Sequence, residues 1–445
     1  MEAVGIRIAT LHSTLNIIEH STFAFPQRRP DRRRIHIMRK LLLALLLFQT
    51  VNVFGQNISS EISSGPLPFT NLTSFLPAPA VAMAKDRTGA AIAWLIPGTI
   101  GDRISVVRLD GTGHFTGQVQ TIPIASSEPV YVIGPSIAAV PRGDGFTLAW
   151  LEIVSTSPPV TRAVYCRLDH DLKPSTPAVL LAITQPITAP AIVRSGKTTW
   201  ISAGASAWEL RDDGSLSAPL NAGINATDMT VGTDFPQVVA LGHVTGALTC
   251  PPACQSAGHF NPCSCQLVRP ITASLQFTSL YSVSLTKDFD FETDAAPAIG
   301  SDGRDIALVW LQGAHNQGGQ VVMSRLLPPA FTDFLAATNQ SQVIGSFGAD
   351  VGATRADIAS DGERHVVVWR TSVGQATHDI VGASIDRGGN IIPLSIATSA
   401  ADERDPSVVS MGDGTFLVAY EKFIDGQRRI AGRFVMFEPR SRAIR

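Results

Sequence analysis

Short apolar segments, separated by turns rich in glycine and aspartate, recur along the chain from about residue 79 to the C-terminus. Each copy has one apolar segment, a turn, and a second apolar segment that ends in an aromatic residue. Because glycine and Asp-Gly turns tolerate the positive φ of tight hairpins, each copy predicts two antiparallel strands. A weaker copy between Ala226 and Leu241 lacks the aromatic residue. The six clear copies end at Trp94, Trp150, Trp200, Trp310, Trp369 and Tyr420.

A second hairpin follows the first in several units, most clearly at 103–115, 162–172 and 379–391. Four strands in about 40 to 60 residues is the spacing of β-propeller blades. A β-sandwich lacks this four-strand period, and an open solenoid has shorter rungs. The pattern therefore predicts an all-β fold, a single β-propeller of about seven four-stranded blades.

The last unit stops soon after its third strand, which ends near Phe437. The extended stretch Pro66–Phe75 precedes the first unit and has no hairpin partner of its own. We expect this N-terminal strand to complete the last blade and close the ring, because closure removes exposed sheet edges.

The hairpin motif resembles the repeat units of secreted bacterial β-propeller proteins. In those units a V-V-W strand is followed by the hairpin motif I-x-G-x-x-x-D-x-x-G. Here the V-V-W strand is Val367-Val368-Trp369, and the hairpin motif runs from Ile380 to Gly389. The resemblance covers nearly all of the chain after residue 76. It implies a fold and not an activity, and it points to no specific enzyme family.

The N-terminal region has the pattern of an export signal. Met38-Arg39-Lys40 is followed by the apolar run Leu41–Phe48 and by a small residue, Gly55. A buried helix or a membrane anchor is the alternative, but this run is too short for a bilayer core of about 30 Å. We therefore interpret 1–37 as a non-native or untranslated leader, 38–55 as a signal peptide and 56–445 as the propeller. The mature chain is expected to be secreted or periplasmic, monomeric, and without a membrane span.

Composition and charge narrow the partners. The chain is 44% hydrophobic and 16% charged, with 37 Gly and 29 Pro, which suits many short strands joined by turns. Residues 1–55 hold eight of the 35 basic and three of the 37 acidic residues, so 27 basic and 34 acidic residues remain, a net charge of −7. Phosphate binding needs a basic surface, so we expect no nucleic-acid partner.

A cysteine-rich insertion at 250–265 interrupts the fourth unit. Its spacing lacks the C-x-x-C pairs usual for zinc, and in an exported chain two local disulfides are the simpler interpretation. The fifth cysteine, Cys166, is expected to be a small buried residue. The insertion contains Cys250, Cys254, Cys263 and Cys265.

Aspartates that recur in the turns are interpreted as scaffold, because a turn aspartate usually bonds its own backbone. The turns contain no calcium loop of the D-x-D-x-D-G type and no intact sialidase Asp-box, so we assign no metal or cofactor there. Arginines recur in the third strands and are expected to join neighbouring blades. The turn aspartates include Asp110, Asp144, Asp302, Asp361, Asp386 and Asp413, and the arginines are Arg108, Arg167, Arg325 and Arg433.

Acidic residues and histidines depart from the repeat at the opposite ends of the strands. Polar, solvated loops would explain them, but such a rim would also suit a cation such as calcium, a sugar or a basic protein. The acidic residues are Asp288, Asp290, Glu292, Asp294, Asp350, Asp357, Asp402, Glu403 and Asp405. The histidines are His243, His259, His315 and His378.

Two classes of function remain. A binding or surface-interaction module for a carbohydrate or protein ligand needs only shape, and we expect this non-enzymatic role. The alternative is a carbohydrate-active propeller enzyme, a glycoside hydrolase or a sialidase-like protein, which needs carboxylates that converge on the axis. Asp294, Asp357 and Asp405 each lie at the start of a first strand and are the candidates for catalysis.

Overall fold

The computed structural model describes the chain in segments and shows only β-structure in them. No helix among these residues is long and apolar enough to cross a membrane. The described residues are 56–63, 81–86, 89–96, 102–112, 114–125, 130–140, 145–154, 156, 160–181, 190–204, 206–221, 225–231, 238–245, 264–271, 281–283, 298–314, 318–326, 341–348, 356–373 and 377–438.

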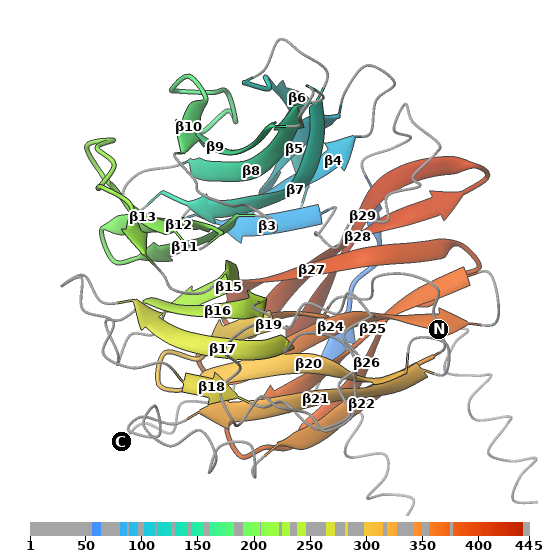
Figure 1. Cartoon of the computed structure of the whole chain (residues 1–445). Helices are drawn as coiled ribbons and strands as arrows, with labels where there is room; N and C mark the ends of the chain where they lie inside the picture. Colours follow the sequence, from blue (N-terminus) through green and yellow to red (C-terminus); the bar gives the residue numbers. More distant parts are fainter. Residues whose placement is uncertain are drawn as a thin grey trace, which may run out of the picture. The chain divides into compact units, whose positions relative to one another are not determined.

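The described strands form seven antiparallel sheets (Figure 1). In six of them the neighbouring strands are consecutive in sequence, and the seventh also contains two N-terminal strands. Sheets 1 to 3 contain β3 (Val81–Lys85), β4 (Gly89–Ile96), β5 (Arg103–Asp110) and β6 (Phe115–Ile122); β7 (Val130–Ala139), β8 (Phe146–Val154), β9 (Val160–Leu168) and β10 (Val179–Leu181); and β11 (Ala191–Ser195), β12 (Thr198–Ala203), β13 (Ser206–Arg211) and β14 (Leu220–Asn221).

Sheets 4 to 6 follow the same order. They contain β15 (Asn225–Val231), β16 (Val238–Thr245), β17 (Ser264–Ile271) and β18 (Tyr281–Val283); β19 (Ala298–Ser301), β20 (Ile306–Ala314), β21 (Gly318–Leu326) and β22 (Gln342–Phe347); and β23 (Ala356–Ser360), β24 (Arg364–Val373), β25 (Thr377–Asp386) and β26 (Ile391–Ala397). The weak fourth repeat therefore does form a sheet, in which the register places Gly242 of β16 where Trp369 stands in the sixth sheet.

Sheet 7 joins the two ends of the described chain. Its C-terminal strands are β27 (Asp402–Gly412), β28 (Thr415–Ile424) and β29 (Gln427–Phe437). The outer edge of β29 pairs with β1 (Gln56–Ile58) and β2 (Ile62–Ser63). An N-terminal segment thus completes this sheet, but it lies earlier in the sequence than the predicted segment Pro66–Phe75, which is outside the described residues.

The repeated aromatic residues are core residues of the second strands. The six aromatic residues are all buried. Four of them belong to described apolar clusters, namely Trp94, Trp150, Trp369 and Tyr420. Trp369 lies so close to β22 of the preceding sheet that a Cβ at Gly345 would stand 2.3 Å from its ring. The glycine is required because any side chain there would overlap the indole.

Apolar clusters fill the spaces between neighbouring sheets. Described clusters lie between sheets 1 and 2, 2 and 3, 5 and 6, 6 and 7, and 7 and 1. The first strand of each sheet contacts the first strand of the next, and β27 contacts β3. Two side chains reinforce the contact of sheets 7 and 1: Lys85 donates to the Met411 carbonyl, and Arg428 Nη1 donates to the Leu95 carbonyl at 2.7 Å.

Three of the recurring arginines join neighbouring sheets in the same way. Arg108 reaches the carbonyl of His170 at 3.2 Å. Arg325 reaches that of Arg387 at 3.0 Å, also in the turn after the third strand of the next sheet. Arg167 reaches the corresponding turn after β13, where it donates to the Asp212 carbonyl at 3.0 Å.

Arg433 does not belong to this series, contrary to the sequence prediction. It pairs with Val418, two residues before the aromatic Tyr420, whereas Arg325 pairs with Ala307, three residues before Trp310. A shift of one residue turns a side chain to the other face of the sheet. Arg433 accordingly contacts the N-terminal segment, with Nη1 3.5 Å from the Ser59 carbonyl oxygen.

The turn aspartates act as the sequence predicted wherever they are described with a bond. Asp361 Oδ1 accepts from the backbone N–H of Glu363 and of Arg364 at 2.8 Å. Asp386 Oδ1 accepts from the Asn390 N–H at 3.0 Å. Asp413 adopts a φ of 51° before Gly414 at 77°, which is the left-handed geometry of a tight hairpin.

Candidate functional site

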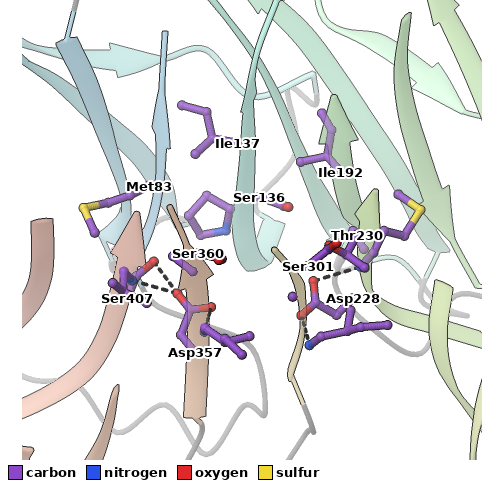
Figure 2. A pocket seen from close by; sticks show the side chains of 18 of the residues that line it. Met83, Ser136, Ile137, Ile192, Asp228, Thr230, Ser301, Asp357, Ser360 and Ser407 are labelled. Atoms are coloured by element: carbon purple, nitrogen blue, oxygen red, sulfur yellow. Dashed lines mark hydrogen bonds between the residues drawn. The ribbon is translucent and has the colours of Figure 1, made fainter. Parts of the chain in front are cut away.

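A cavity of about 270 Å³ lies where the first strands of all seven sheets meet. Every sheet supplies part of its wall, so the cavity is a product of the sheet arrangement and not of one loop (Figure 2). Apolar side chains such as Met83, Ile137 and Ile192 line it together with hydroxyl groups and two carboxylates, those of Asp228 and Asp357.

Asp357 joins β23 to the next first strand, β27. Its Oδ1 accepts from the Ile358 N–H at 2.9 Å. Its Oδ2 accepts from Ser407 Oγ at 2.9 Å and from the Val408 N–H at 2.8 Å (Figure 2). Two of these three bonds cross to the neighbouring sheet, so the carboxylate stabilises the contact between the sheets as well as forming the cavity wall.

Asp228 does the same between β15 and β19. Its Oδ1 accepts from the Met229 N–H at 2.8 Å, and its Oδ2 accepts from the Ile299 N–H at 3.0 Å. Sequence reasoning did not select Asp228, although a signal was present: Asp228-Met229 in the weak fourth repeat occupies the place of Asp357-Ile358 in the sixth. The missing aromatic residue made that alignment the least certain in the chain.

Three of the five residues with hydroxyl groups at the cavity donate hydrogen bonds within the protein. Ser301 Oγ donates to the Asp305 carbonyl at 2.8 Å, and Ser360 Oγ donates to the Arg364 carbonyl at 2.7 Å. Ser407 donates to Asp357, as described above. Ser136 of β7 is half-buried in the wall and adds a further hydroxyl.

Part of the predicted acidic rim lies outside the described residues. This holds for the side chains of the candidates Asp288, Asp290, Glu292, Asp294, Asp350, His243, His259 and His315, and for Cys250, Cys254, Cys263 and Cys265, of which only the backbone of Cys265 is described, in β17. The predicted catalytic set can therefore be followed only at Asp357 and Asp405. The described Cys166 is free and buried, and burial raises the pKa of its thiol to about 12.

His378 and Asp402 do come together, at the start of β25 and of β27. His378 Nδ1 lies 2.6 Å from Asp402 Oδ1, and Arg404 Nη2 lies 2.6 Å from Asp402 Oδ2. Burial by itself would raise the pKa of Asp402, but the bonds from His378 and Arg404 hold it below the usual range. This carboxylate is charged and orients the imidazole ring.

Glu403 points to the other side of β27, and its pKa is shifted in the opposite direction from that of Asp402. It is fully buried, and Ser399 donates a hydrogen bond to its Oε1. Burial raises its pKa, and the charges of Asp379 and Glu61 act in the same direction. Lys422 lies nearby, but its Nζ is 3.9 Å from Glu403 Oε1. The same Nζ lies 2.8 Å from Oε2 of Glu61, and this ion pair holds the N-terminal segment on sheet 7.

Asp405 lies in a bulge of β27. The register shifts between Arg404 and Ser407, and Asp405 has a φ of 48°, which is unusual for a residue other than glycine. The bulge places Pro406 and Ser407 in the cavity wall. Of the rim residues predicted from the sequence, the structure thus puts Asp357 in the cavity, Asp405 directly before it, and Asp402, Glu403 and His378 farther along the same sheets.

Comparisons with known proteins extend to the fold and no further. No family model and no curated protein matches the chain. A protein of unknown function from Dyadobacter fermentans DSM 18053 is similar in structure, with a TM-score of 0.50 and 10% identity over 86% of this chain and all of that one.

Two further solved structures are similar at lower scores. They are the Pan2 WD40 domain of Neurospora crassa (TM-score 0.46, 8% identity, 85% of this chain and 95% of that one) and Trypanosoma rangeli sialidase in complex with sialic acid (0.43, 7%, 85% and 59%). Scores and identities this low carry no argument about function. The four-stranded meander sheets define the class of the protein: an all-β, β-propeller-like fold.

Proposed function

We propose that the chain is a closed seven-bladed β-propeller that binds a small polyhydroxylated ligand, such as a sugar, in the cavity between its first strands. Each of the seven sheets is then one blade. The contact of β27 with β3, and the pairing of β29 with the N-terminal β1 and β2, support closure.

The observation that carries the binding role is the composition of the cavity wall. Apolar side chains from several blades suit the C–H faces of a sugar, while hydroxyl and carboxylate oxygens suit its hydroxyl groups. A carboxylate offers about four acceptor positions, and Asp357 uses three of them within the protein, so it retains one for a ligand. A volume of about 270 Å³ admits only a small ligand or the end of a longer chain.

The same carboxylates favour binding over hydrolysis. A glycosidase needs one carboxyl that carries a proton to the leaving group. Asp357 and Asp228 accept backbone N–H bonds on both oxygens, so both carboxylates are held by the protein's own backbone and not aimed at a leaving group. Hydrolysis remains the second candidate function because two carboxylates do line one cavity.

Calorimetric titration and melting curves with a panel of mono- and oligosaccharides test the proposal, and chromogenic glycosides test the alternative. We expect saturable binding without turnover. Ser136→Phe should fill the cavity and abolish binding, whereas Ser136→Ala should weaken it mildly and Gln118→Phe, on the exposed outer strand β6, should leave it unchanged. Binding that survives Ser136→Phe contradicts this placement, and turnover would establish the alternative function.

We further propose that the mature chain begins at Gln56 and is exported, with two disulfides among Cys250, Cys254, Cys263 and Cys265. The mass of unreduced exported protein should then lie about four hydrogens below the all-thiol value. Cys166 should react with an alkylating agent only after denaturation, because it is buried.

A further inference from the structure

A second group of polar residues lies away from the cavity, at the hairpin between β19 and β20. Asp302 and Asp305 belong to this turn, and His365 comes from β24 of the next sheet. The three side chains offer one ligand atom each within 4.8 Å of one another. All are buried, with exposed fractions of 9%, 2% and 1%. From the sequence, Asp302 was interpreted as scaffold because it recurs in the turns, and Asp305 and His365 were not selected.

The group contains polar atoms without partners. Among the described residues, neither Asp305 Oδ1 nor either ring nitrogen of His365 has a hydrogen-bond partner. His365 Nε2 lies 3.7 Å from Asp305 Oδ1, which is too long for a hydrogen bond. A buried polar group left without a hydrogen bond destabilises the folded chain. Asp305 Oδ1 and His365 Nε2 face each other across 3.7 Å, and an ion between them would satisfy both atoms.

The surrounding bonds orient these atoms toward a common point. Arg325 Nε donates to Asp305 Oδ2 at 2.8 Å, which leaves Oδ1 directed at His365. Asp302 Oδ1 accepts from the N–H groups of Arg304 and Asp305 at 2.9 Å, which fixes the turn. Metal ligands in proteins are commonly held by such outer hydrogen bonds.

We infer that Asp302, Asp305 and His365 form a site for a divalent transition-metal ion, with Zn²⁺ as the ion to test. One imidazole nitrogen and two carboxylate oxygens form a ligand set that zinc accepts, with water in the fourth position. Calcium prefers six to eight oxygens and does not suit a site that contains an imidazole.

The three ligand atoms lie within 4.8 Å of one another, so the site must contract to bind zinc. Tetrahedral zinc with bonds of about 2.1 Å places its ligand atoms about 3.4 Å apart. The distance of 3.7 Å between His365 Nε2 and Asp305 Oδ1 is already close to this value. The ion would join the hairpin of sheet 5 to sheet 6 and would stabilise the folded chain in proportion to its binding.

Two nearby arginine side chains provide a test of whether a metal ion or a water molecule occupies the site. Arg325 Nη2 and Arg387 Nε lie 3.8 Å and 3.7 Å from Asp302 Oδ2. Their charges oppose a bound cation but are indifferent to bound water. Removing the charge of Arg387, which is 35% exposed and is not a ligand, should therefore strengthen zinc binding severalfold.

The experiment uses the mature chain freed of metal by a chelator, with its cysteines alkylated where they react. Calorimetry with Zn²⁺ should show one ion per chain, and melting curves should show a zinc-dependent rise in Tm. Co²⁺ should give a visible spectrum without a thiolate charge-transfer band. His365→Leu should abolish the zinc-dependent rise, while His170→Leu, at an exposed turn, should leave it unchanged.

Arg387→Gln tests the inference without changing a ligand. A zinc affinity that rises in this variant supports the metal site. Absence of zinc binding by the wild-type chain, binding that persists in His365→Leu, or a thiolate band with Co²⁺ would each overturn it. A zinc affinity unchanged in Arg387→Gln would also overturn it, because the bound ion would then lie elsewhere.

Discussion

The carboxylates of the cavity wall and those of the Asp302 hairpin differ in how completely the chain itself satisfies them. Asp228 and Asp357 use both oxygens to accept N–H groups, one of them across to the next sheet. In the hairpin group, Asp305 Oδ1 and both nitrogens of His365 have no hydrogen-bond partner among the described residues. A half-buried or buried carboxylate is therefore not evidence of function by itself. Its hydrogen bonds decide whether it holds the fold together or faces an occupant.

Substitution of Asp357 tests the structural half of this comparison and should have the largest effect. Asparagine keeps the shape but presents an N–H₂ group to a backbone N–H donor, so at least one bond is lost and one donor is left unsatisfied. We expect Asp357→Asn to lower the free energy of unfolding by about 3 kcal/mol. Asp228→Asn should act in the same direction.

Urea denaturation without ligand measures both changes. Asp171→Asn is the matched control, because its carboxylate is 68% exposed and its only described ion pair, with Lys173, spans 3.9 Å; we expect a change below about 0.5 kcal/mol. If Asp357→Asn were as stable as this control, the carboxylate would not be a structural element, and its candidacy for catalysis would be strengthened.

Asp402 and Glu403 extend the comparison to two adjacent residues whose pKa values are shifted in opposite directions. The lowered pKa of Asp402 gives stability that is present above the unfolded value of about 3.9 and lost as the pH falls. The raised pKa of Glu403 gives stability that is present below about 4.3 and lost as the pH rises through the folded pKa.

Unfolding curves between about pH 3 and about pH 8 separate the two effects. Asp402→Asn should be less stable than the wild type at neutral pH, and this difference should shrink in acid. Glu403→Gln should be more stable than the wild type at neutral pH and equal to it in acid, since glutamine mimics the protonated carboxyl. Parallel pH profiles for the two variants would show that their surroundings do not differ as described.

His365→Leu in metal-free protein should show the smallest effect. Leucine has a similar size and removes two unpartnered nitrogens, so we expect a change in the free energy of unfolding of less than about 1 kcal/mol. Calorimetric melting in the presence of a chelator measures it. A loss comparable with that of Asp357→Asn would mean that His365 makes a structural bond, and the two regions would then no longer differ.

The sequence by itself determined the units of this protein. Hairpin turns and buried aromatic residues are local signals, because a tight turn needs residues that accept positive φ and a strand core needs apolar volume. They predicted the strand pairs of all seven sheets, including the weak fourth, and the structural role of the turn aspartates. The same repeat misled at Arg433, where a shift of one residue in register reverses the face and is invisible in a motif.

Only the tertiary structure decided which distant residues meet. The Asp357 carboxylate bonds Val408, 51 positions later, and the outer edge of β29 pairs with residues near position 56. His365 faces Asp305 because two sheets pack together, and no local pattern marks that pairing. Hydrogen-bond satisfaction depends on such contacts between sheets, so the distinction between a structural carboxylate and a ligand site could not be made from the sequence.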